Sequence, residues 1–436
     1  HCKDSGGITN FNISVAITDK FMEALATGGE YELVSPYDGK VTGKMSAKKV
    51  WEEIADGAWK TGDPGLIFLD RINASVANPI RAEGWEVEST NPCGEQPLYP
   101  FDACNLGSIF LGHYVKDHQV DWDKLKETTH LAVRLLDSVI EMNPFPLPQI
   151  TDTVRKIRRI GLGVGGWADM LIQLSIPYDS EEALKLGEQV MKFINEQGHK
   201  ASQQLAKERG PFPMWKQSVY KDDLPIRNST VTTIAPTGTI GILAHASSGI
   251  EPLFAIAYQH IVKTENRTLT YMNEMFESVA KERGFYTEEL MAKVAQKGMI
   301  RDMEEISADV RVVFGTAHEI HPDWHVKMQA AFQKYTDNAV SKTINLHHDS
   351  TREDIKLAYM LAWETGCNGI TVFRDGSKGD QVLNLGTNTD KKEELQTIKP
   401  RPVKVDGATY RIETPMGSAF ITVNHDPDGN PFEVFV

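Results

Sequence analysis

The chain has 436 residues, 41% hydrophobic and 24% charged, which allows a sizeable core in one large domain with a small one, or in two to three medium domains. Its formal net charge of −14 at pH 7 argues against a nucleic-acid or membrane partner, and no stretch is apolar for long enough to span a membrane. Four scattered cysteines, Cys2, Cys93, Cys104 and Cys367, indicate a cytoplasmic protein without a disulfide framework or a structural zinc site.

The first predicted elements alternate between strands and helices. Residues 11–17 form a predicted buried strand, and a helix is expected over 19–26. A turn at 62–65 leads into a strand at 66–69. Between them, Ser46 is a suitable N-cap for a helix whose apolar side carries Val50, Trp51, Ile54, Ala55 and Ala58.

The segment Asn-Pro-Cys-Gly-Glu at 91–95 holds the strongest chemical signal. Its proline and glycine oppose a regular helix, so Cys93 is expected at the tip of a loop. Asn91 and Glu95 lie two residues to either side, and a second thiol, Cys104, follows eleven residues later. Together these groups can move a hydrogen atom and a proton, and two thiols can deliver two electrons as a disulfide. Reduction of a ribose carbon needs this combination.

Long helices are expected in the middle of the chain. One begins at Asp121 and ends before 143–144, and another covers 180–208. We expect the first to face inward with Leu125, Ala132, Leu135, Leu136, Val139 and Ile140.

A possible anion cradle follows a strand predicted at 231–234. The sequence Ala-Pro-Thr-Gly-Thr-Ile-Gly at 235–241, with Ser-Ser-Gly-Ile-Glu-Pro at 247–252, brings hydroxyls and glycine N–H groups to a turn after that strand. The alternative is an ordinary turn with threonine caps, and the motif alone does not decide between the two.

Three other motifs are expected to be structural. The Gly-rich stretch 161–166 fits G-x-G-x-x-G but follows a basic stretch and not a clear strand, so we interpret it as a close helix packing contact. His318, His321 and His325 resemble a metal motif, but a proline interrupts the helix that would align them, and no metal is expected. Cys367 precedes a strand at 369–373 and is expected in the core.

The end of the chain changes character. The polar stretch 380–402 reads as a linker, and the residues from 401 onward alternate like strands. We therefore expect a main body at 1–385, a linker at 386–400 and the start of a small accessory domain at 401–436. Strands that alternate with long helices predict an α/β fold for the main body.

At this point the chain resembles a known family, the catalytic chain of ribonucleotide reductase, and in particular its adenosylcobalamin-dependent (class II) type. The resemblance covers nearly the whole sequence. The matching stretches, in chain order, are FNISVAITDKFM, GDPGLIFLDRIN, NPCGEQPLYPFDACNLGSIFL, RRIGLGVGGWADML, TTIAPTGTIGI, SSGIEPLFA, SKTINL and GCNGITVFRDGS.

The resemblance implies a fold and a set of site residues. The fold is part of a ten-stranded α/β barrel with a central finger loop, truncated at both ends, plus the start of a small C-terminal β-containing domain. Cys93 matches the thiyl-radical cysteine, Glu95 and Asn91 the catalytic carboxylate and amide, and Cys104 one of two redox cysteines. The implied substrate-binding residues are Asn91, Pro92, Cys93, Gly94, Glu95, Pro236, Thr237, Gly238, Thr239 and Ile240.

The implied reaction converts ribonucleotides into the deoxyribonucleotides needed for DNA replication. Adenosylcobalamin generates the Cys93 thiyl, which takes the 3′ hydrogen while Glu95 takes the 3′ hydroxyl proton and the 2′ hydroxyl leaves as water. A cysteine pair becomes a disulfide, which thioredoxin or another dithiol restores. The second redox cysteine is unmatched and Cys2 is not expected to serve, so we expect this chain alone to be inactive. A partial barrel with open strand edges is expected to be unstable alone or to associate, and a homodimer is one possible state.

Several alternatives remain open. Within the family, a class I large subunit takes its radical from a partner, but this chain lacks an adjacent tyrosine pair, and a class III glycyl-radical enzyme is less favoured because Glu95 is present. Outside the family, one alternative is a non-catalytic paralogue, which the intact set of Asn91, Cys93, Glu95 and Cys104 argues against. The other is a thiol-nucleophile hydrolase, which would need a histidine near Cys93; the nearest in sequence is His113, with no motif around it. The choice between diphosphate and triphosphate substrates and the effector rules stay undetermined.

Overall fold

The computed structural model describes residues 11–262, 267–377, 384–385, 404, 406–414, 417–425 and 431–435. The chain divides into two compact units, His1–Asn388 and Thr389–Val436, and each is described by itself. The predicted linker at 386–400 and Cys2 lie outside the described residues. Among the residues that are described, no helix has both the length and the apolarity to cross a bilayer.

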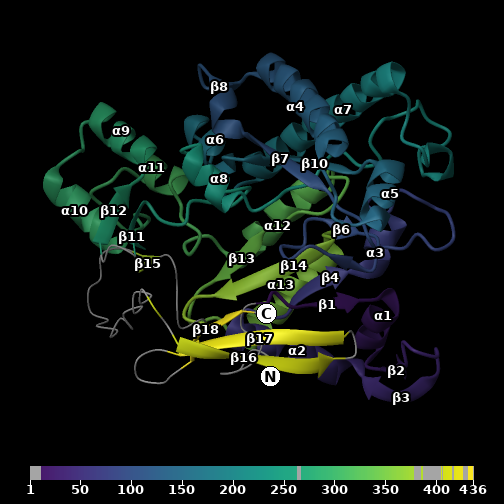
Figure 1. The fold of residues 1–436 in the computed structure, drawn as a ribbon. Coiled ribbons are helices and arrows are strands. Elements are labelled where there is room, and N and C mark those ends of the chain that lie inside the picture. Colours follow the sequence, from purple (N-terminus) through teal and green to yellow (C-terminus); the bar gives the residue numbers. More distant parts are fainter. Residues whose placement is uncertain are drawn as a thin grey trace. The chain divides into compact units, whose positions relative to one another are not determined.

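One sheet of the first unit joins strands from its two ends. It contains β1 (Ser14–Ile17), β4 (Gly65–Phe68), β14 (Gly369–Arg374) and β13 (Thr343–Leu346), in that order. The β1–β4 and β13–β14 pairs are parallel, whereas β4 and β14 are antiparallel. The predicted strands at 11–17, 66–69 and 369–373 correspond to three of these strands. The antiparallel contact therefore joins two parallel segments (Figure 1).

Helices cover this sheet with an apolar core. They are α1 (Asp19–Thr27), α2 (Ala47–Thr61) and α13 (Arg352–Glu364), and α2 packs against both α13 and β14. The Ser46 side chain accepts a hydrogen bond from the Lys49 N–H and caps α2, as predicted. The shared core contains Trp51, Ile54, Leu66, Ile344, Tyr359 and the fully buried Cys367, which confirms the expected core position of that cysteine.

A second group of parallel segments carries the site. Strand β7 (Asn105–Phe110) pairs in parallel with β10 (Ile160–Gly165). The predicted strand at 231–234 is extended but forms only single parallel bridges, from Leu162 to Thr232 and from Ile234 to Val340. The chain then continues from Val340 into β13. The described segments form part of the arc of a barrel, and no closed barrel is present among them.

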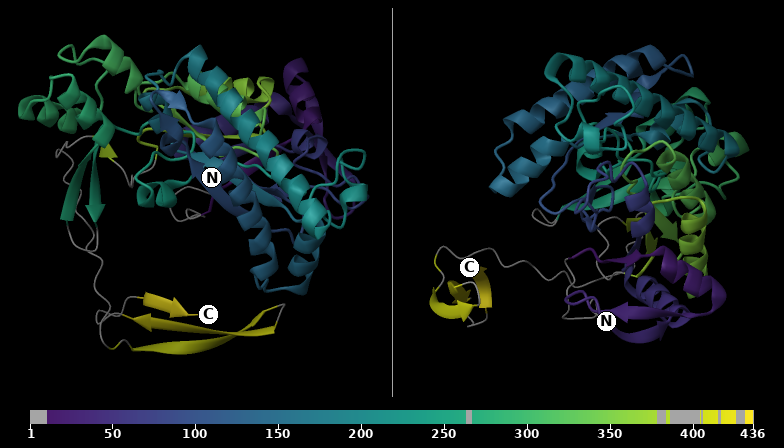
Figure 2. Two further views of the ribbon diagram at one scale, coloured as in Figure 1. Left: turned by 90° about the horizontal axis from the view of Figure 1, so that it is seen from above. Right: turned by 90° about the vertical axis from the view of Figure 1, so that its right-hand side faces the viewer.

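Two long helices cover β7 and β10. Helix α4 (Trp122–Met142), capped by Asp121 as predicted, packs beside α7 (Glu181–Arg209), and α12 (Pro322–Gln333) packs on α7 (Figure 2). The predicted inward face of α4 is partly wrong, because Leu135 and Val139 are 63% and 37% exposed while Leu125, Leu136 and Ile140 are buried. The apolar stripe of α4 is wider than the face that its neighbours cover.

The sequence interpretation of the Gly-rich stretch 161–166 as a helix packing contact is wrong. The stretch forms the fully buried strand β10, followed by a left-handed Gly166 and helix α6 (Trp167–Gln173). A Cβ atom at Gly163 would lie 2.1 Å from the Thr233 carbonyl oxygen. The glycines are needed because the 231–234 segment lies directly against this strand.

The remaining elements complete both units. In the second unit, β16 (Asp406–Thr414), β17 (Gly417–His425) and β18 (Pro431–Phe435) form an antiparallel meander, as the alternation after residue 401 predicts. The first unit also contains β2 (Glu30–Val34), β3 (Val41–Ser46), α3 (Leu69–Ala74), β5 (Ser89–Thr90), β6 (Pro97–Leu98), η1 (Leu111–Tyr114), β8 (Val115–Lys116), β9 (Gln119–Val120), α5 (Pro148–Ile157), η2 (Trp215–Gln217), α8 (Gly238–Leu243), β11 (Ala257–Val262), β12 (Arg267–Met272), α9 (Glu274–Glu282), α10 (Glu288–Lys297), α11 (Ala308–Val313) and β15 (Asn384–Leu385).

Candidate active site

Cys93 lies on a tight turn between two short strands. β5 and β6 pair in an antiparallel manner, and the Gly94 N–H closes the turn by donating to the Asn91 carbonyl at 3.0 Å. Gly94 has a φ of 82°, a conformation that favours glycine. The Cys93 residue is exposed, so the predicted loop tip is confirmed.

The Asn91 side chain ties the two sides of the turn together. Its Oδ1 accepts the Gln96 N–H at 3.0 Å, and its side chain also hydrogen-bonds the Glu95 carboxylate. Glu95 is only 2% exposed, and its Oε2 has no hydrogen-bond partner among the described residues. Burial raises the pKa of Glu95, and the Asn91 hydrogen bond opposes part of that shift. The carboxyl is therefore a stronger base than an exposed glutamate.

Two backbone carbonyl groups, those of Glu95 and Pro92, anchor the turn to the rest of the unit. The backbone carbonyl oxygen of Glu95 accepts hydrogen bonds from the Thr233 hydroxyl at 2.7 Å and from the Ala339 N–H at 3.0 Å. A further bond joins the Asn12 Nδ2 to the Pro92 carbonyl at 3.0 Å. Contacts from three distant parts of the sequence therefore hold the turn in place.

Cys104 occupies the position directly before β7. It is a half-buried free thiol whose Sγ lies 3.3 Å from the Asn105 carbonyl oxygen. Burial raises the pKa of the Cys104 thiol, Arg159 opposes this, and the carboxylates of Asp102 and Glu95 add to it. Burial and then Glu95 also raise the pKa of Cys93. Glu95 therefore raises the pKa of both thiols and is the predicted site residue whose charge acts on both Cys93 and Cys104.

The predicted anion cradle is a turn in which two segments interlock. Thr237 is a buried residue with a φ of 54°, and its hydroxyl oxygen accepts the Gly249 N–H at 2.7 Å. Gly238, Thr239 and Ile240 are exposed in the first turn of α8, and a Cβ at Gly238 would meet no atom within 4 Å. The Thr237 hydroxyl thus supports the turn, while the three residues that follow it are exposed.

The cradle and the thiol turn share one support. Thr233, which holds the Glu95 carbonyl, is four residues before Thr237. Their Cα atoms are therefore at most about 14 Å apart. This short connection places the two predicted parts of the site on neighbouring backbone.

Sequence reasoning missed several buried polar residues around the thiols. The Arg159 side chain is fully buried, and its Nε donates to the Asp102 Oδ2 at 2.9 Å. Gln96 is 2% exposed, and both polar atoms of its amide lack a partner among the described residues. A charged residue directly before an apolar Gly-rich run was the available signal for Arg159.

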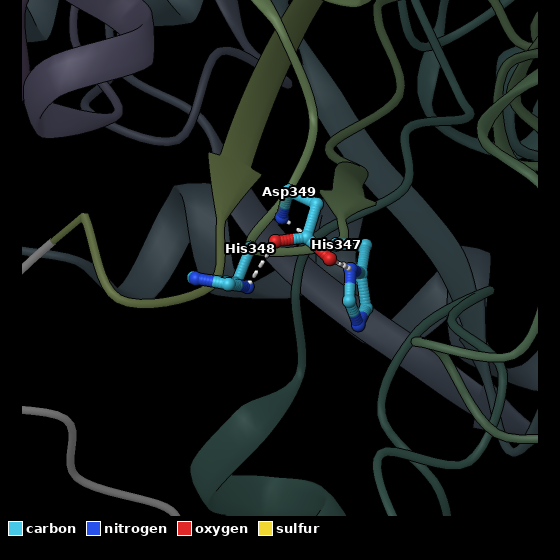
Figure 3. A group of neighbouring side chains, drawn as sticks. All are labelled: His347, His348 and Asp349. Atoms are coloured by element: carbon cyan, nitrogen blue, oxygen red, sulfur yellow. Dashed lines mark hydrogen bonds and ion pairs between the residues drawn. The ribbon is translucent and has the colours of Figure 1, made fainter.

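Of the three histidines in the metal-like motif, His325 makes contacts inside the core. His325 is buried, with its Nε2 3.1 Å from the Ala317 carbonyl and its Nδ1 3.0 Å from the Lys342 Nζ. Among the described residues, the group with metal-ligand spacing is the exposed loop His347–His348–Asp349 after β13 (Figure 3). Asp349 oxygens lie 3.4 Å and 2.8 Å from the Nδ1 atoms of the two imidazoles.

The chain belongs to the ribonucleotide reductase family. Residues 1–373 match the family described as "Ribonucleotide reductase, barrel domain". Among solved structures, the class Id ribonucleotide reductase alpha subunit of Actinobacillus ureae is similar with a TM-score of 0.69 and 24% identity, covering 86% of this chain and 67% of that one. The predicted fold class, an α/β chain that forms part of the reductase barrel, is confirmed.

Curated relatives narrow the resemblance to one type. A vitamin B12-dependent ribonucleoside-diphosphate reductase of Thermoplasma acidophilum is 50% identical over 410 residues, covering 93% of this chain and 53% of the relative. One of the same name from Mycobacterium tuberculosis is 46% identical over 377 residues, covering 86% and 54%. The chain thus spans about half the length of these relatives.

Proposed function

We propose that this chain carries the catalytic centre of a vitamin B12-dependent ribonucleotide reductase, which reduces ribonucleotides to 2′-deoxyribonucleotides. The observation that carries the proposal is the turn at Asn91–Glu95, where an exposed thiol lies two residues from a buried carboxyl whose Oε2 has no hydrogen-bond partner among the described residues. The names of the two relatives support this function, and their description as diphosphate reductases favours a ribonucleoside diphosphate as substrate.

The turn fits a radical-generating cofactor in one respect. Cys93 is exposed, and a Cβ at the adjacent Gly94 would meet no atom within 4 Å, so the thiol is accessible from outside the turn. When bound, adenosylcobalamin supplies the one-electron oxidation that converts the Cys93 thiol into a thiyl radical.

The side chains of the site divide the remaining work. The Cys93 thiyl takes the 3′ hydrogen atom, and Glu95 accepts the proton of the 3′ hydroxyl, which makes it easier for the 2′ hydroxyl to leave as water. Cys104 and a second thiol give two electrons and two protons, one proton to the departing 2′ hydroxyl and one to C2′, and become a disulfide. The hydrogen then returns from Cys93 to C3′, which restores the thiyl, and a thioredoxin-like or other dithiol reduces the disulfide.

The substrate contacts divide between the two parts of the site. We assign the ribose to Asn91, Pro92, Cys93, Gly94 and Glu95. The phosphates are assigned to the turn of Pro236, Thr237, Gly238, Thr239 and Ile240, because exposed residues begin α8 there and backbone N–H groups at such a turn suit an anion.

The test uses the intact protein with adenosylcobalamin, a ribonucleoside diphosphate and dithiothreitol. We expect deoxyribonucleotide to form, and we expect Cys93→Ser to abolish it. Cys367→Ser is the matched control, since that thiol is buried in a separate core and should leave turnover intact. Full activity of Cys93→Ser would overturn the proposal, and activity that needs a metal-containing partner subunit in place of the cofactor would favour the class I alternative.

A further inference from the structure

Arg159 is a fully buried arginine at the edge of the proposed site. Its Nε pairs with the Asp102 carboxylate at 2.9 Å, and its Nη1 donates to the Ala77 carbonyl at 3.0 Å and the Asn338 Oδ1 at 2.8 Å. The guanidinium carbon lies 5.3 Å from the centre of the Tyr99 ring. The Asp102 carboxylate and these acceptors offset the cost of burying the charge, and Nη2 is the one guanidinium nitrogen for which the described residues provide no acceptor.

The strand register places Arg159 beside Cys104. Strands β10 and β7 are parallel, and their first paired residues are Ile160 and Asn105. Arg159 and Cys104 are the residues directly before that pair, one on each strand. Asp102 lies two residues before Cys104, and its Oδ1 accepts the Ala103 N–H at 2.8 Å. The ion pair therefore fixes the short segment that leads into the thiol.

The charges around Cys104 oppose one another. Arg159 and Asp102 act on the thiol with opposite sign, and Glu95 adds a second negative charge. Of these three groups, Arg159 alone favours the thiolate. The thiolate is the form that attacks or leaves in thiol–disulfide exchange.

We propose that Arg159 is a positioning residue for Cys104: it holds Asp102 at the start of β7 and sets a positive charge against the sulfur, so that Cys104 exchanges more readily as a thiolate. The redox meaning of this role rests on the proposed function. The effect on the thiol itself does not, because it follows from charge and register alone.

Arg158, the residue before Arg159 in the segment that leads into β10, provides a matched control. Its side chain is 3% exposed and pairs with the fully buried Asp137 at 2.7 Å and with Glu141 at 2.5 Å. It thus makes a buried ion pair of the same kind, but it does not contribute to the electrostatics of Cys104.

The experiment measures the rate at which iodoacetamide alkylates Cys104 in the reduced, intact protein at pH 8.5, with each thiol followed by peptide mass spectrometry. We expect Arg159→Gln to slow the reaction roughly tenfold, the change that one pKa unit produces. Asp102→Asn should accelerate it, because a negative charge is removed. Arg158→Gln should leave the rate within about twofold, since it changes no charge close to the sulfur.

Opposite shifts separate the proposal from simple loosening of the structure. If the ion pair only supported packing, Arg159→Gln and Asp102→Asn would both expose the thiol and both raise its rate, and that result would overturn the proposal. Protection of Cys367 reports whether each variant is folded. If Arg159→Gln unfolds, Asp102→Asn still offers a result that overturns the proposal, namely an unchanged or slower Cys104 rate with Cys367 protected.

These rates also stand apart from turnover. An intact protein without reductase activity would refute the proposed function, but the alkylation rates would still test the role of Arg159. Conversely, an active enzyme with unchanged Cys104 rates in both variants would refute only the role of Arg159.

Discussion

At the scale of single residues, Glu95 is buried, and no residue in the described part of the chain hydrogen-bonds its Oε2. It is 2% exposed, and Asn91 supplies the side-chain hydrogen bond that stabilises its charge. A base is most useful when its pKa approaches the working pH, and burial moves Glu95 in that direction. Burial thus raises the pKa of Glu95, the base that we propose, and its neighbour Asn91 limits how far that pKa rises.

We expect the pH dependence of kcat to reflect the raised pKa of Glu95 and the effect of Asn91 on that pKa. The base is lost as pH falls through the raised pKa of Glu95, so the acidic limb of kcat should lie above the ordinary glutamate value of 4.5. Asn91→Ala removes a bond that lowers the pKa and should move the limb to higher pH. Glu95→Gln should reduce kcat by about 10²–10⁴ and abolish the limb. An acidic limb that persists in Glu95→Gln would assign it to another group.

At the scale of elements, β10 and the 231–234 segment are packed closely enough to act as one unit. Gly163 faces the Thr233 backbone, and Thr233 in turn holds the Glu95 carbonyl. A side chain at Gly163 therefore acts on the segment that supports the thiol turn.

We expect Gly163→Ala to lower the free energy of unfolding by about 1–3 kcal/mol, the usual cost of overpacking. The new Cβ would lie 2.1 Å from the Thr233 oxygen, and a backbone oxygen moves only with its strand. Gly43→Ala in β3 is the control, because its nearest neighbour is the Leu33 Cδ1 at 3.8 Å. Equal denaturation midpoints for the two variants would contradict the close packing.

A second element-level contact joins α7 to the same segment. The Asp337 carboxylate accepts the Val231 N–H at 2.7 Å and pairs with the His199 Nε2 at 3.0 Å. Burial disfavours the charged imidazole, but the Asp337 carboxylate outweighs it and raises the pKa of His199. The stabilisation from this pair is therefore complete below the ordinary pKa of 6.5 and is lost as pH rises through the raised pKa.

We expect Asp337→Asn to cost about 3–5 kcal/mol of unfolding free energy, as loss of one partner of a buried pair does. It should also remove the decline in stability between neutral and alkaline pH that His199 causes. Denaturant titrations at a series of pH values measure both effects. His199→Gln should remove the same decline, and a decline that survives in both variants would belong to other groups.

At the scale of the whole molecule, the described segments form part of a barrel arc, and the chain spans about half the length of its curated relatives. Among the described cysteines, Cys93 is assigned to the radical and Cys367 is buried in another core, so Cys104 is the single reducing thiol that we assign.

We therefore expect the 436-residue chain alone, with adenosylcobalamin, a ribonucleoside diphosphate and dithiothreitol, to form no deoxyribonucleotide. The intact protein assayed in parallel is the control. The product is measured by chromatography of the nucleotides. Turnover by the isolated chain at the rate of the intact protein would show that its own residues complete the site.

The sequence predicted the parts of the molecule that depend on local patterns. The cap at Ser46, the helix start at Asp121 and the exposed turn at Cys93 follow from residue types and spacing. The Gly-rich strand β10 was misread because its glycines are explained by a segment some seventy residues away. Arg159 was missed for the same reason, since its importance comes from the β7 register and not from its neighbours in sequence.

The double hydrogen bond to the Glu95 carbonyl has a consequence for ligand selection. Because the Thr233 hydroxyl donates to that carbonyl four residues before the Thr237 turn, a short stretch of backbone limits the distance between the Cys93 turn and the predicted anion cradle. If both parts bind one nucleotide as we propose, the site selects its ligand by length: a molecule whose sugar and charged end are too close together or too far apart would not reach both parts at once.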